Sequence, residues 1–324
     1  MRYVVAQGSA RCGGHITLLF TVDDRTENLI DQGSRGLGFC VSAGLIVTAT
    51  LDPSKQGIKG RIWSLEHPGG IQLDSNQLAL YQTVNELVHA SIPHEGGWTL
   101  EVRTSLPLSH GFGMSAAGSL ASTTAMMQAL GFPRHPMIGS IAHRVERLRS
   151  GGLGDVVALL AGGVEARMRA GLRPEDAPEG KGMVRTWSSD QPVVLVWGEG
   201  SGTRTTSFID DPIWARAITT SGETGMEGID TIRDMELEAM FELANRFASD
   251  SGLDSVPQFD EMRTRVNRVI GSNLPLAHCL LGPSVAILPR TMETGIDVVN
   301  RLRKEGLNAV LTRVERRPLG ASGH

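Results

Sequence analysis

A glycine-rich loop directly before a run of small residues constrains this chain more than any other feature. Gly111, Gly113 and Gly118 surround Ser115 at the expected start of a helix over residues 114–130. Glycine lets a backbone approach a ligand closely. The first turn of a helix offers unpaired N–H groups and a partial positive charge. Together these features predict an anion site, typically for phosphate.

The surroundings of this loop contain no acidic residue. Between Glu101 and Glu146 there is no Asp or Glu in 44 residues (102–145). A polyphosphate site would exclude carboxylates in this way, but tight packing of a helix against a sheet also favours small residues, so both interpretations stay open. Any phosphate charge would be met by backbone N–H groups, Arg and a metal ion, because none of the four Lys is near the loop (Lys55, Lys59, Lys181 and Lys304).

Three other motifs resemble parts of the same loop. Walker A requires GxxxxGK[ST], which the chain lacks. A Rossmann fingerprint can be placed on residues 111–116, but it needs an acid about 20 residues further on. A nucleophile elbow around Ser115 lacks its final Gly, although Ser115, Asp155 and His278 follow the chain order of hydrolases. Phosphate binding is the interpretation that the residues favour.

Two carboxylates follow the acid-free stretch. Glu146 lies on an expected helix, three residues after His143 and therefore on the same face. Asp155 follows a glycine-rich turn at the expected start of another helix. Mg²⁺ is usually held by one or two carboxylates together with phosphate oxygens and water. Phosphoryl transfer also needs an Asp that takes the proton of the acceptor hydroxyl. Glu146 suits the first role and Asp155 the second.

Each carboxylate also has an ordinary structural interpretation. Glu146 could be a solvated helix residue paired with Arg144 or Arg149. Asp155 could be only a helix N-cap, which is worth ~0.5–2 kcal/mol.

Composition bounds the class of protein. The chain has 324 residues, 40% hydrophobic and 20% charged, which is enough to form a sizeable core. At ~100–200 residues per domain, two domains are expected. The net charge of −4 lacks the electrostatic footprint of a nucleic-acid binder.

Cysteine content and apolar runs indicate the compartment. The three Cys (Cys12, Cys40 and Cys279) form no CxxC and are odd in number, which fits a reducing compartment. The longest mostly apolar run, residues 36–51, is shorter than the ~20 residues of a membrane helix. The first residues lack the apolar centre of a signal peptide. We expect a soluble, cytoplasmic protein with no membrane partner; a homodimer is expected only as the commonest soluble oligomer.

Hydrophobic periodicity and turn residues predict the order of elements. In the first half we expect strands at residues 3–6, 16–22, 39–50, 61–65 and 98–104, a glycine-rich turn at 7–15, and helices at 75–92, 114–130, 136–149 and 155–170. In the second half we expect strands at 191–198 and 308–314, strand-like runs within 276–289, helices at 228–250, 258–271 and 292–305, and a loose tail from 316. The Pro-, Gly- and charge-rich segment 171–182 divides an α+β chain into domains 1–172 and 173–324.

With these residues described, the sequence resembles the GHMP kinases. Their second motif is a Pro, three variable residues and Gly-Leu-Gly-Ser-Ser-Ala-Ala. The chain reads Pro107-Leu-Ser-His-Gly-Phe-Gly-Met-Ser-Ala-Ala117, in which Phe112 and Met114 depart from the commonest residues. The resemblance implies that ATP binds to Pro107, Gly111, Phe112, Gly113, Met114, Ser115, Ala116 and Ala117.

The resemblance also implies an architecture and a mechanism. An N-terminal layer like ribosomal protein S5 domain 2 would pack on a ferredoxin-like C-terminal layer, with ATP and substrate in the cleft between them. Ser115 and Glu146 would bind Mg²⁺, and Asp155 would act as base, so these three are the candidate catalytic residues. The family's C-terminal motif is glycine-rich, and residues 280–285 match it only weakly, with one glycine.

Within the family, the sequence is similar to the archaeal kinases of pantoate, through residues 14–17 and 33–36 and the form of the glycine loop. That likeness implies phosphorylation of the 4-hydroxyl of pantoate on the way to coenzyme A. A small hydroxy acid needs a cation for its carboxylate, which Arg provides. The candidate substrate residues are His15, Ser34, Arg35, His143 and Arg167. Mevalonate- or homoserine-type acceptors, and a nucleotide-binding regulator without activity, remain alternatives.

Overall fold

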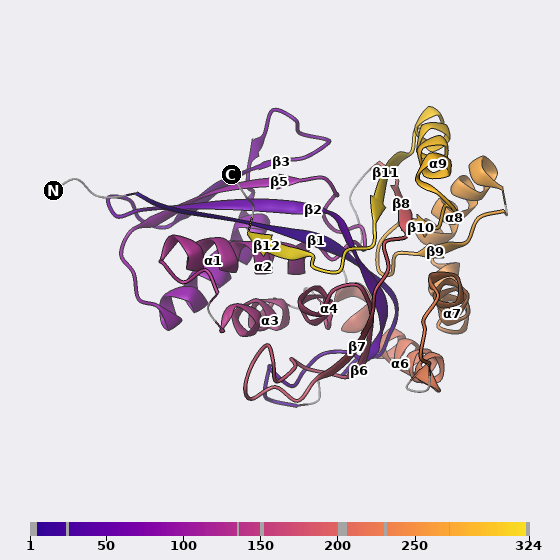
Figure 1. The fold of residues 1–324 in the computed structure, drawn as a ribbon, viewed down its shortest axis with the longest axis horizontal. Helices are drawn as coiled ribbons and strands as arrows, with labels where there is room; N and C mark the ends of the chain where they lie inside the picture. Colours follow the sequence, from indigo (N-terminus) through magenta and orange to yellow (C-terminus); the bar gives the residue numbers. More distant parts are fainter. Residues whose placement is uncertain are drawn as a thin grey trace.

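Two β-sheets with helices packed on them make up the computed structural model (Figure 1). The described residues are 5–23, 26–134, 136–149, 152–199, 206–229, 232–271 and 273–321. One continuous apolar core includes residues of both sheets, and a second cluster lies beneath the helices α8 (Pro257–Ile270) and α9 (Met292–Lys304).

The first sheet has eight strands in the order β12-β1-β2-β5-β3-β4, with β6 added to β2 and β7 to β6. Its pairs are antiparallel except β3 with β5. The strands are β1 (Ala6–Phe20), β2 (Gly36–Asp52), β3 (Ile58–Trp63), β4 (Ile71–Gln72), β5 (Gly97–Thr104), β6 (Val164–Arg169), β7 (Met183–Trp187) and β12 (Leu319–Ala321). β5 and β6 pair with different ends of β2.

The prediction of a glycine-rich turn at residues 7–15 is wrong, because β1 runs through these residues without interruption. A Cβ on Gly8 would lie only 2.1 Å from the carbonyl oxygen of Ala125 on the helix above. Gly8 therefore allows close packing of a helix on β1, and the pairing of β1 with β2 is irregular between Gly13 and Gly14 and between Thr17 and Leu19. Residues 1–4, where another strand was expected to begin, lie outside the described residues.

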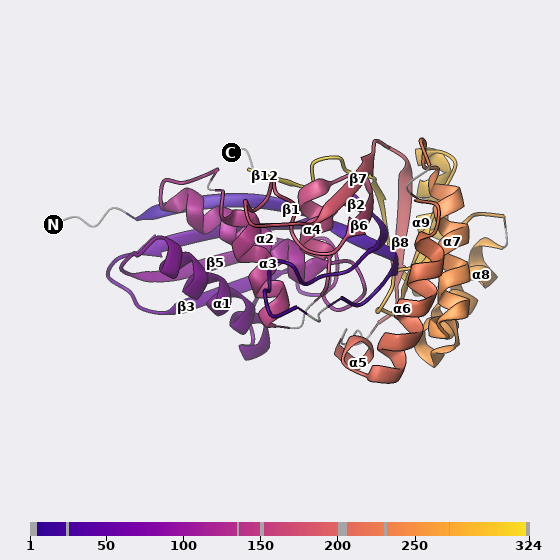
Figure 2. The ribbon, with the colours of Figure 1, turned by 90° about the horizontal axis from the view of Figure 1, so that it is seen from below.

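Four helices cover one face of the first sheet (Figure 2). They are α1 (Ser75–Ser91), α2 (Met114–Ala129), α3 (Ile138–Leu148) and α4 (Asp155–Ala161). α2 lies centrally and is buried almost all round, which explains its small residues. The helix expected at 155–170 is too long: Gly162 and Gly163 both have positive φ (73° and 72°) and end α4, and β6 follows.

The second sheet has four antiparallel strands in the order β11-β8-β10-β9. They are β8 (Pro192–Trp197), β9 (Leu276–His278), β10 (Ser284–Ile287) and β11 (Asn308–Arg313). Helices separate β8 from β9, a turn joins β9 to β10, and a helix separates β10 from β11. This β-α-β-β-α-β connection is ferredoxin-like, so the predicted C-terminal layer is confirmed.

The helices of the second half are α5 (Thr206–Ile209), α6 (Pro212–Met226), α7 (Leu237–Asp250), α8 (Pro257–Ile270) and α9 (Met292–Lys304). α6 was not predicted, because its β-branched residues and mid-helix glycine hide the helical pattern. Its start is nevertheless well defined: Pro212 occupies the first turn, and the Asp211 side chain accepts from the N–H groups of Ile213 and Trp214.

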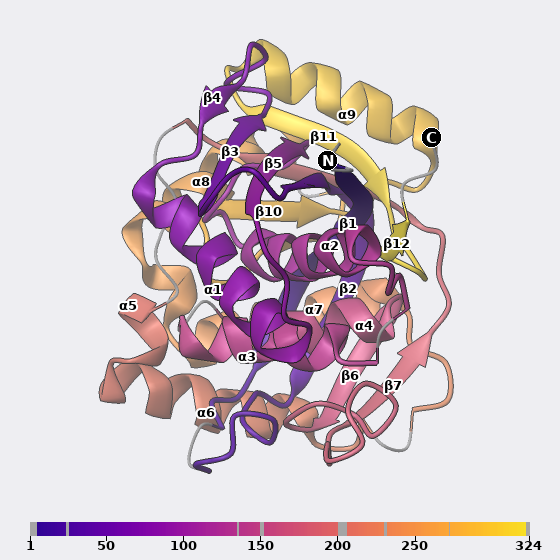
Figure 3. The ribbon, with the colours of Figure 1, turned by 90° about the vertical axis from the view of Figure 1, so that its left-hand side faces the viewer.

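Two strands beyond residue 173 belong to the first sheet. β7 pairs with β6, and β12 pairs with β1, so the tail from residue 316 is not loose as expected. Figure 3 shows β11, in the second sheet, leading into β12. The division between residues 172 and 173 therefore does not coincide with a change of sheet, and it stays a prediction. Within the described residues, no helix combines the length and apolarity needed to cross a bilayer. All three cysteines are buried and free.

Candidate active site

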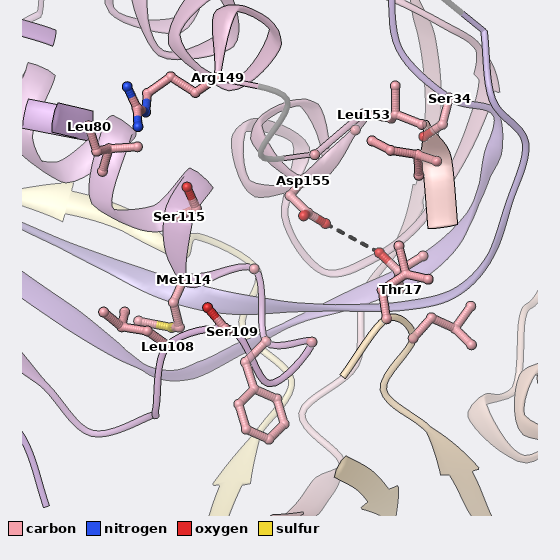
Figure 4. A pocket seen from close by; sticks show the side chains of 18 of the residues that line it. Thr17, Ser34, Leu80, Leu108, Ser109, Met114, Ser115, Arg149, Leu153 and Asp155 are labelled. Atoms are coloured by element: carbon pink, nitrogen blue, oxygen red, sulfur yellow. Dashed lines mark hydrogen bonds between the residues drawn. The ribbon is translucent and has the colours of Figure 1, made fainter. Parts of the chain in front are cut away.

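A pocket of about 440 Å³ lies at the N-terminus of α2. The glycine loop forms one wall, and the start of α4 faces it (Figure 4). The rest of the lining includes residues of β1, α1, the loop before β2, the end of α3, β6 and the turn after β9, among them Ser34, Leu80, Arg149, Arg167 and Leu281.

The glycine loop adopts the backbone that its glycines allow. Gly111 and Gly113 have φ of 79° and 64°, in the left-handed region. Gly113 is the N-cap of α2, and no side chain caps this helix. The first-turn N–H groups are therefore left for a ligand, and Ser115 is exposed and points into the pocket (Figure 4).

The C-terminal half fixes the loop from behind. The hydroxyl of Ser284 donates to the carbonyl of His110. A Cβ on Gly282 would lie 2.1 Å from the carbonyl carbon of His110, so only glycine fits there. The ring of Phe112 packs edge-on against Trp197, with centroids 5.8 Å apart. Phe112 thus anchors the loop to the second sheet.

We expect Gly113→Ala to weaken nucleotide binding. A Cβ at this position would lie 3.1 Å from that of His15 on a left-handed backbone, which costs roughly 1–2 kcal/mol. The matched control is Gly131→Ala, at φ 91° just past the other end of α2, where nothing lies within 4 Å of the added Cβ. Both variants should melt at a lower temperature. Only Gly113→Ala should lose ATP affinity in calorimetric titration; equal losses would contradict the loop's role.

The two predicted carboxylates meet beside Gly152. An added Cβ there would lie 2.7 Å from Oε1 of Glu146 and 3.1 Å from Oδ2 of Asp155. Asp155 lines the pocket as the first residue of α4, whose N-cap is Gly154. Glu146 is 3% exposed and lies behind the pocket wall. Neither ordinary interpretation therefore holds: Glu146 is not solvated, and Asp155 is not the N-cap.

Glu146 is a buried carboxylate without a compensating partner. Neither of its oxygens has a hydrogen-bond partner among the described residues, and His143 Nδ1 is 3.8 Å from Oε2. Burial, and then the charge of Asp155, raise its pKa to about 8. Such a group fits a cation site, because a cation would supply the missing charge. Within the described residues no three His, Cys, Asp or Glu side chains gather as a metal site, so phosphate oxygens would have to complete it.

We expect Glu146→Gln to stabilise the metal-free protein more at pH 9 than at pH 5.5. The raised pKa means that the folded state holds a proton that the unfolded state releases near its ordinary value of 4.5. The wild type therefore loses stability as pH rises from about 4.5 to about 8, where the loss is complete, while Gln stays neutral. At pH 9 the variant should melt about 2–8 °C higher, since relieving an unpaired buried charge is worth ~1–3 kcal/mol.

The measurement is a thermal melt with and without Mg²⁺ at both pH values. Glu101→Gln is the control, because that side chain is 53% exposed and should show no such difference. A variant less stable than wild type at pH 9 would contradict the assignment of an unpaired charge.

Asp155 is held by two donors on one oxygen. Its Oδ1 lies 2.6 Å from His15 Nδ1 and accepts from the Thr17 hydroxyl at 3.2 Å. The other ring nitrogen of His15 is 3.0 Å from Glu165 Oε1, which also accepts from the guanidinium of Arg167. Both of these hydrogen bonds are to Oδ1, while Oδ2 of Asp155 lies beside Gly152.

This arrangement shifts two pKa values in opposite directions. Burial of Asp155 raises its pKa, but the hydrogen bond and charge of His15 outweigh burial and lower it. Burial of His15 lowers its pKa, but its bonds to Asp155 and Glu165 outweigh burial and raise it. Both shifts favour the charged forms of the pair, a carboxylate beside an imidazolium.

The predicted substrate residues lie at different depths. Ser34 and Arg167 line the pocket, with Arg167 Nε donating to Ser34 Oγ at 3.3 Å. His15 lies behind Asp155. His143 donates from Nε2 to the carbonyls of Leu29 and Gln32 (3.0 and 3.1 Å), and burial lowers its pKa to about 4. His143 therefore supports the loop before β2 as a neutral ring.

Seven predicted residues do not line the pocket themselves, and His15, behind Asp155, is one of them. Pro107 precedes the loop, Ala116 and Ala117 are buried in α2, and Glu146 and His143 lie behind the wall. Arg35 also lies off the pocket, and its buried Nε has no partner among the described residues.

The sequence did not reveal Thr17, Arg149 and Glu165. Glu165 was hidden because residues 155–170 were interpreted as helix; the alternation in VEARMR, after two glycines, could have indicated a strand. Arg149 extends from the end of α3 toward Leu80, on the same side of the pocket as Ser115 (Figure 4). No signal in the sequence indicates that Thr17 faces Asp155.

Residues 79–163, which include α2, α3, α4 and both carboxylates, match the family described as GHMP kinases N terminal domain. The chain contains a GHMP kinase N-terminal domain. Its sequence is 27% identical over 285 residues to pantoate kinase of Thermococcus kodakarensis, with 86% of each chain covered. It is 26% identical over 295 residues to pantoate kinase of Methanospirillum hungatei, with 88% of this chain and 89% of the relative covered.

Solved structures share the fold of this chain. A phosphotransferase related to the CoA biosynthesis pathway has a TM-score of 0.76 at 23% identity, with 98% of both chains covered. MDDEF in complex with MVAPP, AMPPCP and magnesium has a TM-score of 0.69 at 15% identity, with 99% of this chain and 100% of that one covered. The predicted α+β, two-layer GHMP kinase architecture is confirmed.

Proposed function

We propose that this protein is an ATP- and Mg²⁺-dependent kinase that phosphorylates the 4-hydroxyl of pantoate. The observation that supports the reaction class best is one pocket that joins an uncapped helix N-terminus to an oriented carboxylate. The relatives named pantoate kinase, which match over most of the chain, support the acceptor. We propose the cytoplasm as its compartment, and a homodimer remains a prediction.

The glycine loop would bind the phosphates. The N–H groups of residues 111–116 belong to the loop and first turn at the positive end of the α2 dipole, and the Ser115 hydroxyl lies beside them. Ser115 and Glu146 would hold Mg²⁺ together with phosphate oxygens. When bound, Mg²⁺ neutralises the charge that develops on the transferred phosphoryl group.

Asp155 would take the proton of the acceptor hydroxyl. His15 and Thr17 hold its Oδ1, so the carboxylate cannot rotate freely and Oδ2 meets the acceptor. Its lowered pKa keeps it ionised and ready to accept at neutral pH. Arg167 and Ser34 line the same side of the pocket and would bind the acceptor's carboxylate.

We expect the purified protein to transfer phosphate from ATP to pantoate faster than to mevalonate or homoserine. Asp155→Asn should lower turnover about 10²–10⁴-fold while ATP still binds, because base catalysis contributes that range. The measurement is ADP release with each acceptor plus mass spectrometry of the product. Faster transfer to mevalonate or homoserine would show that pantoate is not the preferred acceptor. Near-wild-type turnover in Asp155→Asn would remove its role as base, and nucleotide binding without transfer to any acceptor would favour a regulator.

Arg149 is expected to bind the nucleotide phosphates. It is the one pocket-lining Arg for which no ion pair is seen among the described residues, since Arg167 is paired with Glu165. We expect Arg149→Ala to raise the KM for ATP about 10-fold, the value of one charge-assisted contact, with kcat and the KM for pantoate nearly unchanged. Arg144→Ala is the control, on the same helix but outside the pocket. An unchanged KM for ATP would exclude this role.

A further inference from the structure

A line of buried hydrogen bonds joins the proposed base to the proposed carboxylate-binding Arg. It runs from Asp155 through His15 and Glu165 to Arg167, and Ser34 ends it. We call these five residues the buried network. The side chains of His15 and Glu165 are 0% exposed and that of Arg167 is 2% exposed, so water does not screen the charges.

The geometry of His15 favours a doubly protonated ring. Each ring nitrogen faces a carboxylate oxygen, at 2.6 Å (Asp155) and 3.0 Å (Glu165). A neutral imidazole has one N–H, so one nitrogen lone pair would face an oxygen lone pair. With the imidazolium, two negative and two positive groups in the buried network balance to zero.

The backbone around the buried network leaves it no room to shift. Glu165 and Arg167 on β6 stand directly opposite Gly38 and Gly36 on β2. A Cβ on Gly38 would lie 2.8 Å from Glu165 Oε1, and one on Gly36 would lie 2.7 Å from Arg167 Nη2. A Cβ on Gly154 would lie 2.7 Å from Arg167 Nε. Three glycines therefore shape the space around these side chains.

Glu165 connects the two halves of the buried network through a single oxygen. Its Oε1 accepts from both His15 and Arg167, whereas Oε2 has no partner among the described residues. Removing the charge of Glu165 would leave His15 with one carboxylate and Arg167 with none. Both the base and the cation would then lose a fixed position.

We propose that Glu165 is a positioning residue that fixes the separation between Asp155 and Arg167, and so selects hydroxy acids by the distance from their carboxylate to the reacting hydroxyl. The proposal rests on the proposed function, because it takes Asp155 as the base and Arg167 as the carboxylate site. Neither Glu165 nor His15 needs to touch the substrate. The base and the carboxylate site are rigidly linked, so a shorter or longer acid cannot reach both.

The test uses three unbranched acids with terminal hydroxyls: 3-hydroxypropionate, 4-hydroxybutyrate and 5-hydroxypentanoate. For the wild type we expect kcat/KM to favour 4-hydroxybutyrate by at least about 10-fold, as expected for a site built around a fixed pair of polar contacts. In Glu165→Gln we expect the preference to fall below about threefold, and the KM for pantoate to rise ~10–100-fold. The KM for ATP should change less than about twofold, because the glycine loop is untouched.

Two further variants separate positioning from stability. Glu165→Asp keeps the charge and should restore part of the length preference. Asp176→Asn removes a carboxylate that accepts from Arg173 at 2.6 and 3.0 Å outside the pocket. It should lower the melting temperature without altering either KM or the preference. Loss of activity at unchanged KM and unchanged preference in Glu165→Gln would mean a merely structural role.

Nitrogen NMR of the histidine rings tests the buried network without turnover. In the wild type at pH 7.5, His15 should show two N–H signals, identified by their loss in His15→Gln. One N–H signal would overturn the proposal even if pantoate is phosphorylated. A wild type that phosphorylates pantoate without length preference would overturn it too. A wild type with both N–H signals but no activity on any hydroxy acid would instead refute the proposed function, and with it the selectivity claim.

Discussion

The close approach of α2 to β1 is the contact on which the site depends. Gly8 allows it near one end of the helix, where a Cβ would meet the carbonyl of Ala125 at 2.1 Å. Gly113 allows it at the other end, where the helix begins against His15. Because β1 carries His15 and Thr17, this packing brings an uncapped helix N-terminus to the strand that holds Asp155. A larger residue at either glycine would move the anion site away from the carboxylate.

The pocket separates its charges by sign. The side formed by α2 offers backbone N–H groups and the Ser115 hydroxyl, and the acid-free stretch 102–145 keeps carboxylates off the elements beneath it. The facing side carries Asp155, with Glu146 behind it. A phosphate on the first side and a cation between the two would neutralise both sides. The same distribution explains why the overall charge of −4 says little about the ligand: the potential beside the start of α2 is positive although the net charge of the chain is negative.

The sequence predicted the parts of the site that depend on local patterns. The glycine loop, the helix after it and the two carboxylates follow from spacing and residue type, and the second sheet follows from alternating apolar runs. It could not predict β1 through residues 7–15, because glycines that allow close packing look the same as glycines that make a turn. It also could not predict that Glu165 and Arg167 point inward from β6. Buried charges in a short strand resemble a solvated helix face until the two glycines opposite them on β2 are known.

The two carboxylates show how one fold gives the same group two chemical properties. Asp155 and Glu146 are nine positions apart and meet beside Gly152, yet their pKa values move in opposite directions. An imidazolium and a hydroxyl hold Asp155, so it stays ionised. Glu146 has no comparable partner: burial and the charge of Asp155 outweigh the backbone N–H of Val156 and favour its protonated form. Environments that separate the pKa values of two neighbouring carboxylates give them different roles. Asp155 is ionised and can accept a proton, whereas Glu146 ionises readily only beside a positive partner. For Glu146, that partner must be positive, which is the physical reason for placing the metal there.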